Sequence, residues 1–230
     1  MNTQDYDKTI EALTVISRAI TSDRYLEDIL RLIVLVTAEV MNSKICSLWL
    51  LDDKTQALTI RATQSINREY LKKRSLKVGE GIVGYVAEHN KPYCSVNVLE
   101  DDRFKEKTLA RQLGLISLLS VPMSVRERVI GVINCYTSFP HEFTETEQNL
   151  FTTVANQAAV AIFNTELMVK SKVMQEELEV RKLIERAKDS LIRRRNLSGE
   201  EAYRWIQKRS MDSRKSMREV AEAVLLLEEI

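Results

Sequence analysis

The sequence predicts an α+β fold: an antiparallel sheet flanked by helices, then a long connecting helix of coiled-coil-like character and a small three-helix unit. Three observations predict it. The apolar strand segments include neighbours joined by short polar connections, which is typical of hairpins and not of the helical crossovers of a parallel sheet. No Gly or Pro occurs between Thr144 and Gly199. Ser/Thr-x-x-Glu patterns, which are capping boxes, begin three of the predicted helices.

The first part of the chain predicts helices followed by strands. Apolar residues of the segment Leu26–Met41 recur at helical spacing on one face, and a further helix is expected over Tyr6–Ile20. The polar segment 125–127 between two apolar runs predicts a hairpin. The expected strands are Ile45–Leu51, Ala57–Ala62, Ile116–Met123 and Arg128–Tyr136.

A glycine-containing segment, L76-K-V-G-E-G-I-V-G-Y-V-A-E-H-N-K-P92, carries the sharpest local signal. Gly79 and Gly81 permit a tight entry into a short helix, and Gly84 lets that helix approach the sheet closely. Together with N97-V-L-E-D-D-R103-F, S120-V-P-M and R128-V-I-G-V-I-N, the segment resembles the GAF domain family over about residues 24–167. The resemblance implies a sensory domain that receives a small-molecule signal in its pocket or serves in dimerisation. The ligand itself, and any cofactor, is unknown.

The helix expected from Thr144 to Arg195 is too long for one globular core, because some fifty residues at about 1.5 Å each span about 75 Å. Leu150, Val154, Ala158 and Ala161 would pack its start, and the apolar stripe continues at Leu167, Met174 and Leu178. Helices with apolar residues beyond their own domain usually find a partner helix. We therefore expect a parallel homodimer, with Tyr6–Ile20 and Leu26–Met41 adding contacts, although the polar patch at 170–172 interrupts the stripe.

Positive charge is concentrated near the C-terminus. Segment 188–218 holds ten Lys/Arg against four Asp/Glu, whereas the whole chain has 34 against 33. Capping boxes at Ser198/Glu201 and Ser216/Glu219 predict two helices here. The helical phase places Ala202, Ile206 and Ser210 inside, joined by Tyr203, and Val220, Ala221, Val224 and Leu227 inside in the last helix. It leaves these residues outside or on the connection: Arg204, Trp205, Lys208, Arg209, Arg214 and Lys215.

The same segment resembles the ANTAR family of RNA-binding domains. The matching residues are A187-K188, S198-x-x-E-A202-Y203, S210-M211-x-x-R214 and V220-A221. Asp189 stands where the family usually has Gly, and Ser210 where it usually has Ala. The predicted organisation is thus a GAF domain with N-terminal helices over 1–165, a shared connecting helix over 144–195 and an ANTAR domain over 173–230.

The resemblance implies a bacterial antitermination regulator that binds structured leader RNA. Lys188 and Arg214 match positions of the ANTAR pattern, and the other candidates follow from helix phase and charge. Lys/Arg contacts to phosphates release counterions, and aromatic rings can stack on unpaired bases. The candidate RNA-binding residues are Lys188, Arg193, Arg195, Arg204, Trp205, Arg209, Arg214 and Lys215.

Other site chemistry finds little support. Cys46, Cys94 and Cys135 are scattered over three expected strands or their edges, and with His89 and His141 they give no metal-ligand spacing. No nucleophile motif or P-loop is present, so we expect no enzyme and no metal. Two alternatives stay open: a redox-active GAF enzyme or sensor resembling a sulfoxide reductase, and a DNA-binding regulator. With no signal peptide and no long apolar run, the sequence predicts a cytoplasmic protein without membrane contact.

Overall fold

The computed structural model describes residues 3–22, 25–67, 70 and 75–226, and for residues 3–6 it describes the backbone only. The chain forms two compact units, residues 1–165 and 166–230. Helix α6 (Glu145–Arg195) is continuous through the polar patch at 170–172 and contributes to both. No helix within the described ranges is long and apolar enough to cross a membrane.

A six-stranded sheet of order β3-β2-β1-β6-β5-β4 forms the first unit, and every neighbouring pair is antiparallel. The predicted antiparallel sheet is therefore confirmed. Arg126 and Glu127 connect β5 to β6 with positive φ at both positions, which suits the right-handed twist of a hairpin. The strands are β1 Ile45–Asp52, β2 Ala57–Thr63, β3 Ser75–Lys77, β4 Tyr93–Ser95, β5 Leu118–Val125 and β6 Arg128–Tyr136.

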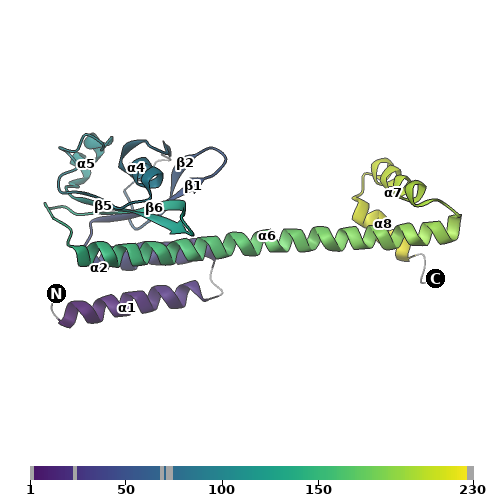
Figure 1. The fold of residues 1–230 in the computed structure, drawn as a ribbon, viewed down its shortest axis with the longest axis horizontal. Coiled ribbons are helices and arrows are strands. Elements are labelled where there is room, and N and C mark those ends of the chain that lie inside the picture. Colours follow the sequence, from purple (N-terminus) through teal and green to yellow (C-terminus); the bar gives the residue numbers. More distant parts are fainter. Residues whose placement is uncertain (1–2, 23–24, 68–69, 71–74, 227–230) are drawn as a thin grey trace. The chain divides into compact units, whose positions relative to one another are not determined.

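Helices cover both faces of this sheet (Figure 1), and a hydrophobic cluster lies between the sheet and the helices on each face. On one face lie α2 (Leu26–Val40) and the first part of α6, whose Phe151, Ala158 and Ile162 are buried, and α1 (Thr3–Ile20) packs beyond them, away from the sheet (Figure 1). On the other face lie α4 (Gly81–His89) and α5 (Lys107–Leu113), packed through Val83, Val86 and Ala110. The strands β3 and β4 and helix α5 are short, and the sequence pattern did not predict them.

Helix α4 approaches the sheet as closely as its backbone allows. A Cβ on Gly84 would lie 2.3 Å from the carbonyl oxygen of Lys77 at the end of β3. Gly79, with φ +81°, makes the turn before the helix and donates its N–H to the carbonyl of Gly84 at 2.9 Å. The predicted role of both glycines is thereby confirmed, since no larger residue fits Gly84 without moving α4.

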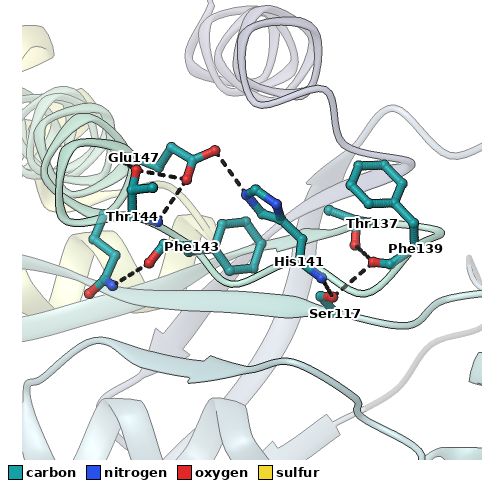
Figure 2. A network of polar contacts seen from close by, with 8 residues as sticks. Ser117, Thr137, Phe139, His141, Phe143, Thr144 and Glu147 are labelled. Carbon is teal, nitrogen blue, oxygen red and sulfur yellow. Dashed lines mark hydrogen bonds and ion pairs between the residues drawn. The ribbon is translucent and has the colours of Figure 1, made fainter. Parts of the chain in front are cut away.

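The start of α6 is tied to the sheet by a chain of polar contacts (Figure 2). Thr144 and Glu147 form the predicted capping box: the Thr144 N–H donates to Glu147 Oε2 at 2.7 Å, and the Glu147 N–H donates to Thr144 Oγ1 at 3.3 Å. The same carboxylate meets His141 Nε2 at 2.9 Å. His141 in turn donates its backbone N–H to the buried Ser117 hydroxyl at 2.7 Å.

The second unit consists of the end of α6 with α7 (Gly199–Ser213) and α8 (Met217–Leu226). Ala187, Leu191, Ala202, Ile206, Val220, Ala221 and Val224 form its buried core. The predicted capping boxes at Ser198 and Ser216 are both present. Leu227, which was expected to point inward, lies outside the described residues.

Candidate nucleic-acid interface

The basic side chains of the second unit include one group around the corner between α6 and α7 and another around the turn between α7 and α8, with Lys208 on α7 between them. One group lies where α6 ends and α7 begins, and includes Arg193, Arg195 and Arg204. The other lies at the turn between α7 and α8, and includes Arg209, Arg214 and Lys215; all six residues are exposed. Ten residues separate Arg204 from Arg214, which corresponds to about 15 Å along a helix. Lys208 and Arg209 lie between these two residues, so exposed positive charge continues along α7.

At the first corner, Asn196 reverses the chain with φ 51° and Ser198 caps α7. The guanidinium of Arg195 lies over the Trp205 ring, 4.8 Å from its centroid. Arg204 makes an ion pair with Glu200 one helical turn earlier, at 2.5 Å. Both side chains of that pair are largely exposed, so the pair adds little stability and leaves Arg204 accessible.

The two aromatic residues of α7 exchange their expected places. Trp205, expected to face solvent, is partly buried and packs against the core of the unit. Tyr203, expected inside, is 42% exposed. At 100° per residue, both residues flank the buried stripe of Ala202 and Ile206 at about 80°, so helix phase alone cannot choose between them. Contacts from the rest of the unit decide the matter, because Arg195 covers the Trp205 ring.

Arg214 occupies a backbone conformation that favours glycine. It follows the last residue of α7 with φ 55° and ψ 30°, and its N–H donates to the Met211 carbonyl at 3.3 Å. The Ser210 hydroxyl donates to the Lys215 carbonyl at 2.5 Å and closes the turn. An arginine in this left-handed region costs stability that a glycine would save. Such a residue at an exposed turn suggests a functional role for its side chain.

Lys188 is less available than the sequence suggested. Its ammonium group donates to both carboxylate oxygens of Glu185, at 2.8 and 3.0 Å, and its side chain is only 19% exposed. A phosphate contact by Lys188 would therefore require this ion pair to open. Arg218, which helix phase and charge did not single out, is paired with Glu222 at 2.9 Å. This pairing raises the pKa of the Arg218 guanidinium.

A row of buried polar groups crosses the sheet beneath α4 and α5. Ser47, Asn134 and Ser120 are register partners on β1, β6 and β5. Ser47 Oγ accepts from the Tyr70 hydroxyl at 2.8 Å and from Trp49 Nε1 at 3.3 Å. The Ser120 hydroxyl donates to Asn134 Oδ1 at 2.6 Å.

The cysteines are not scattered as the sequence suggested. Cys46 and Cys135 face each other on β1 and β6, and both are buried free thiols. The Cys46 backbone bonds away from β6, to the side chains of Gln64 and Thr63, so the cysteines form a non-hydrogen-bonded pair, in which side chains approach closely. Burial raises the pKa of Cys46, with a further contribution from Cys135, and burial raises the pKa of Cys135 to about 12. Both are therefore neutral, weakly nucleophilic thiols near pH 7.

Comparison with known proteins matches this architecture to two families. The sequence model of the GAF domain matches residues 25–162, and that of the ANTAR domain matches residues 172–225. The transcriptional regulatory protein PdtaR of Mycobacterium tuberculosis is 40% identical over 116 residues, which is 50% of this chain and 46% of that protein. The chain thus spans about half the length of this curated relative.

Solved structures resemble the first unit. The GAF domain of a phosphoenolpyruvate-protein phosphotransferase from Coxiella burnetii is 25% identical with a TM-score of 0.64, covering 71% of this chain and 97% of that one. The GAF domain of an Acinetobacter phosphoenolpyruvate-protein phosphotransferase is 26% identical with a TM-score of 0.62, covering 74% and 99%. The chain belongs to the GAF domain family, and an ANTAR domain follows its GAF domain.

Proposed function

We propose that this protein is a signal-responsive transcription antitermination regulator of a bacterium. Its ANTAR unit binds the hairpins of a structured leader RNA and favours an antiterminator over a terminator. Its GAF unit controls that binding in response to a signal. The observation that carries the proposal is the placement of basic residues at both ends of α7, in a domain of the ANTAR family. A regulator of nascent transcripts acts in the cytoplasm, by binding and without catalysis.

Hairpin RNA suits this surface better than duplex DNA. Readout of a DNA major groove uses a helix inserted along one face. Here the basic groups lie on three parts of the unit: the end of α6, α7 itself and the turn after α7. The bases of a hairpin loop are unstacked and can be read by aromatic and guanidinium planes, whereas those of an A-form stem are not accessible. Trp205 with Arg195, and the exposed Tyr203, supply such planes.

A homodimer would present two of these surfaces to two hairpins. Val160, Leu167, Met174 and Leu178 are each more than 40% exposed, and at 100° per residue they fall within about 40° of one line along α6. Such a stripe is stabilised when a second helix covers it. We therefore propose a parallel dimer through α6, with α1 and α2 adding contacts. Light scattering of the purified chain tests it, and a monomer mass at micromolar concentration would contradict it.

For the signal, we propose a small molecule bound by the GAF unit. Mass spectrometry of protein purified under native conditions would identify a retained molecule.

The RNA proposal is tested by binding of the full chain to a synthetic RNA with two stem-loops and to duplex DNA of equal length. We expect preference for RNA, weaker binding by Arg214→Glu and a salt dependence reduced by about one charge or more. Circular dichroism serves as the control, and the variant should give the wild-type spectrum because the Arg214 side chain is exposed. Equal wild-type affinity for RNA and DNA, or an unaltered variant, would refute the proposal.

A further inference from the structure

One pair in the second unit is organised differently from its other basic residues. The Arg195 guanidinium, at the last residue of α6, lies 4.8 Å from the centroid of the Trp205 ring. Trp205 is itself held, because it is partly buried against the core that joins α6, α7 and α8. The chain between them is also fixed: Asn196 turns with φ 51°, Leu197 packs on the same core and Ser198 caps α7.

This arrangement places the Arg195 guanidinium over the Trp205 ring and limits the movement of a side chain that is normally mobile. The cation–π attraction to the indole restricts the orientations that the guanidinium samples. Because Arg195 remains exposed, the guanidinium face turned away from Trp205 is open to solvent. By contrast, no aromatic ring faces Arg209 or Arg214 in the part of the chain that the structure describes.

We propose that Trp205 and Arg195 form a stacking platform for one unpaired base of a hairpin loop, so that indole, guanidinium and base lie in succession. This inference rests on the proposed RNA-binding function. Arg195 touches the base, whereas Trp205 is a positioning residue that acts through Arg195. A phosphate would need only the charge of Arg195, whereas a base needs its flat face, and the flat face is what the indole holds in place.

Lysine at position 195 separates these two chemistries. Arg195→Lys keeps the charge and removes the planar group, so a phosphate contact would survive and a stack would not. We expect Arg195→Lys to weaken binding of a synthetic two-stem-loop RNA about three- to tenfold. The dependence of the binding constant on salt concentration should stay unchanged, because the charge is kept. Arg218→Lys, which lies outside the candidate RNA-binding residues and whose guanidinium is paired with Glu222, is the matched control, and we expect its affinity to stay within about twofold of wild type.

The coupling between the two residues gives the second arm. Trp205→Leu should weaken RNA binding as much as Arg195→Lys, Trp205→Phe should retain most of the affinity, and the double variant should be no weaker than either single one. Circular dichroism and unfolding curves show whether Trp205→Leu folds; if it does not, Arg195→Lys and Trp205→Phe decide alone. Additive losses would mean that the residues act independently and would overturn the platform.

The probe RNA supplies the third arm. With abasic residues throughout both loops, wild type should lose affinity and become equal to Arg195→Lys. If wild type binds both RNAs equally and Arg195→Lys is unimpaired, Arg195 contacts phosphate only, and the platform fails while the RNA-binding function stands. If wild type shows no preference for RNA over duplex DNA, the proposed function itself fails.

Discussion

Replacing Arg214 with glycine should change stability and RNA binding in opposite directions. The residue lies in the left-handed region, with φ 55°. That conformation costs a residue with a Cβ about 1–2 kcal/mol, and the greater freedom of glycine in the unfolded chain returns about 0.4–1 kcal/mol of this. Arg214→Gly should therefore stabilise the second unit by about 0.5–1 kcal/mol. For a unit of this size, the gain corresponds to an increase in Tm of a few degrees.

The same substitution removes one proposed phosphate contact. A hydrogen bond to a charged group contributes about 1.5–3 kcal/mol, so RNA affinity should fall about tenfold or more, and the salt slope by about 0.7–0.9. Thermal unfolding followed by circular dichroism and titration of a two-stem-loop RNA measure both effects. Arg209→Gly is the control: it removes the same charge from a helix interior, where glycine should destabilise by about 1 kcal/mol. A destabilised Arg214→Gly, or one that binds RNA as wild type does, would refute the reasoning.

Three further outcomes follow from the structure. Met174→Lys should shift the dimer toward monomer in light scattering, whereas Met168→Lys, off the stripe, should not; equal effects would contradict the interface. Because burial raises the pKa of Cys135 to about 12 from 9.0, its stabilising contribution is complete below pH 9 and is lost as pH rises toward 12. Cys135→Ala should therefore unfold at a higher pH than wild type in an alkaline titration, and it should still bind RNA at pH 7. Loss of the signal response in this variant would instead indicate a functional thiol. Glu185→Gln should release Lys188 from its ion pair and raise RNA affinity about twofold. Lys188 would be excluded as a contact if affinity does not rise, or if the rise persists in a Glu185→Gln/Lys188→Gln double variant.

Local patterns predicted the fold well where each depends on few residues. Capping boxes need only a hydroxyl and a carboxylate three residues apart, and those at Thr144, Ser198 and Ser216 all form. The glycine at 84 likewise revealed its close contact with the sheet. The short strands β3 and β4 were not predicted, because three residues are too few to show an alternation of apolar and polar side chains.

The sites were harder to predict because they depend on contacts between elements. Nothing in the sequence near Cys46 shows that Cys135, on a strand far along the chain, stands opposite it. The exchange of Trp205 and Tyr203 arises in the same way, since both flank one buried stripe. Glu185 and Lys188 lie at helical spacing, so their ion pair could have been recognised from the sequence. The low exposure of the Lys188 side chain could not, because it depends on packing within the folded unit.

The polar contacts at the start of α6 also limit how the first unit can move. Glu147 holds the first turn closed, and through His141 and Ser117 that turn is joined to the sheet (Figure 2). Because Ser117 directly precedes β5, a shift of β5 at this end would act on the first turn of α6 through these hydrogen bonds.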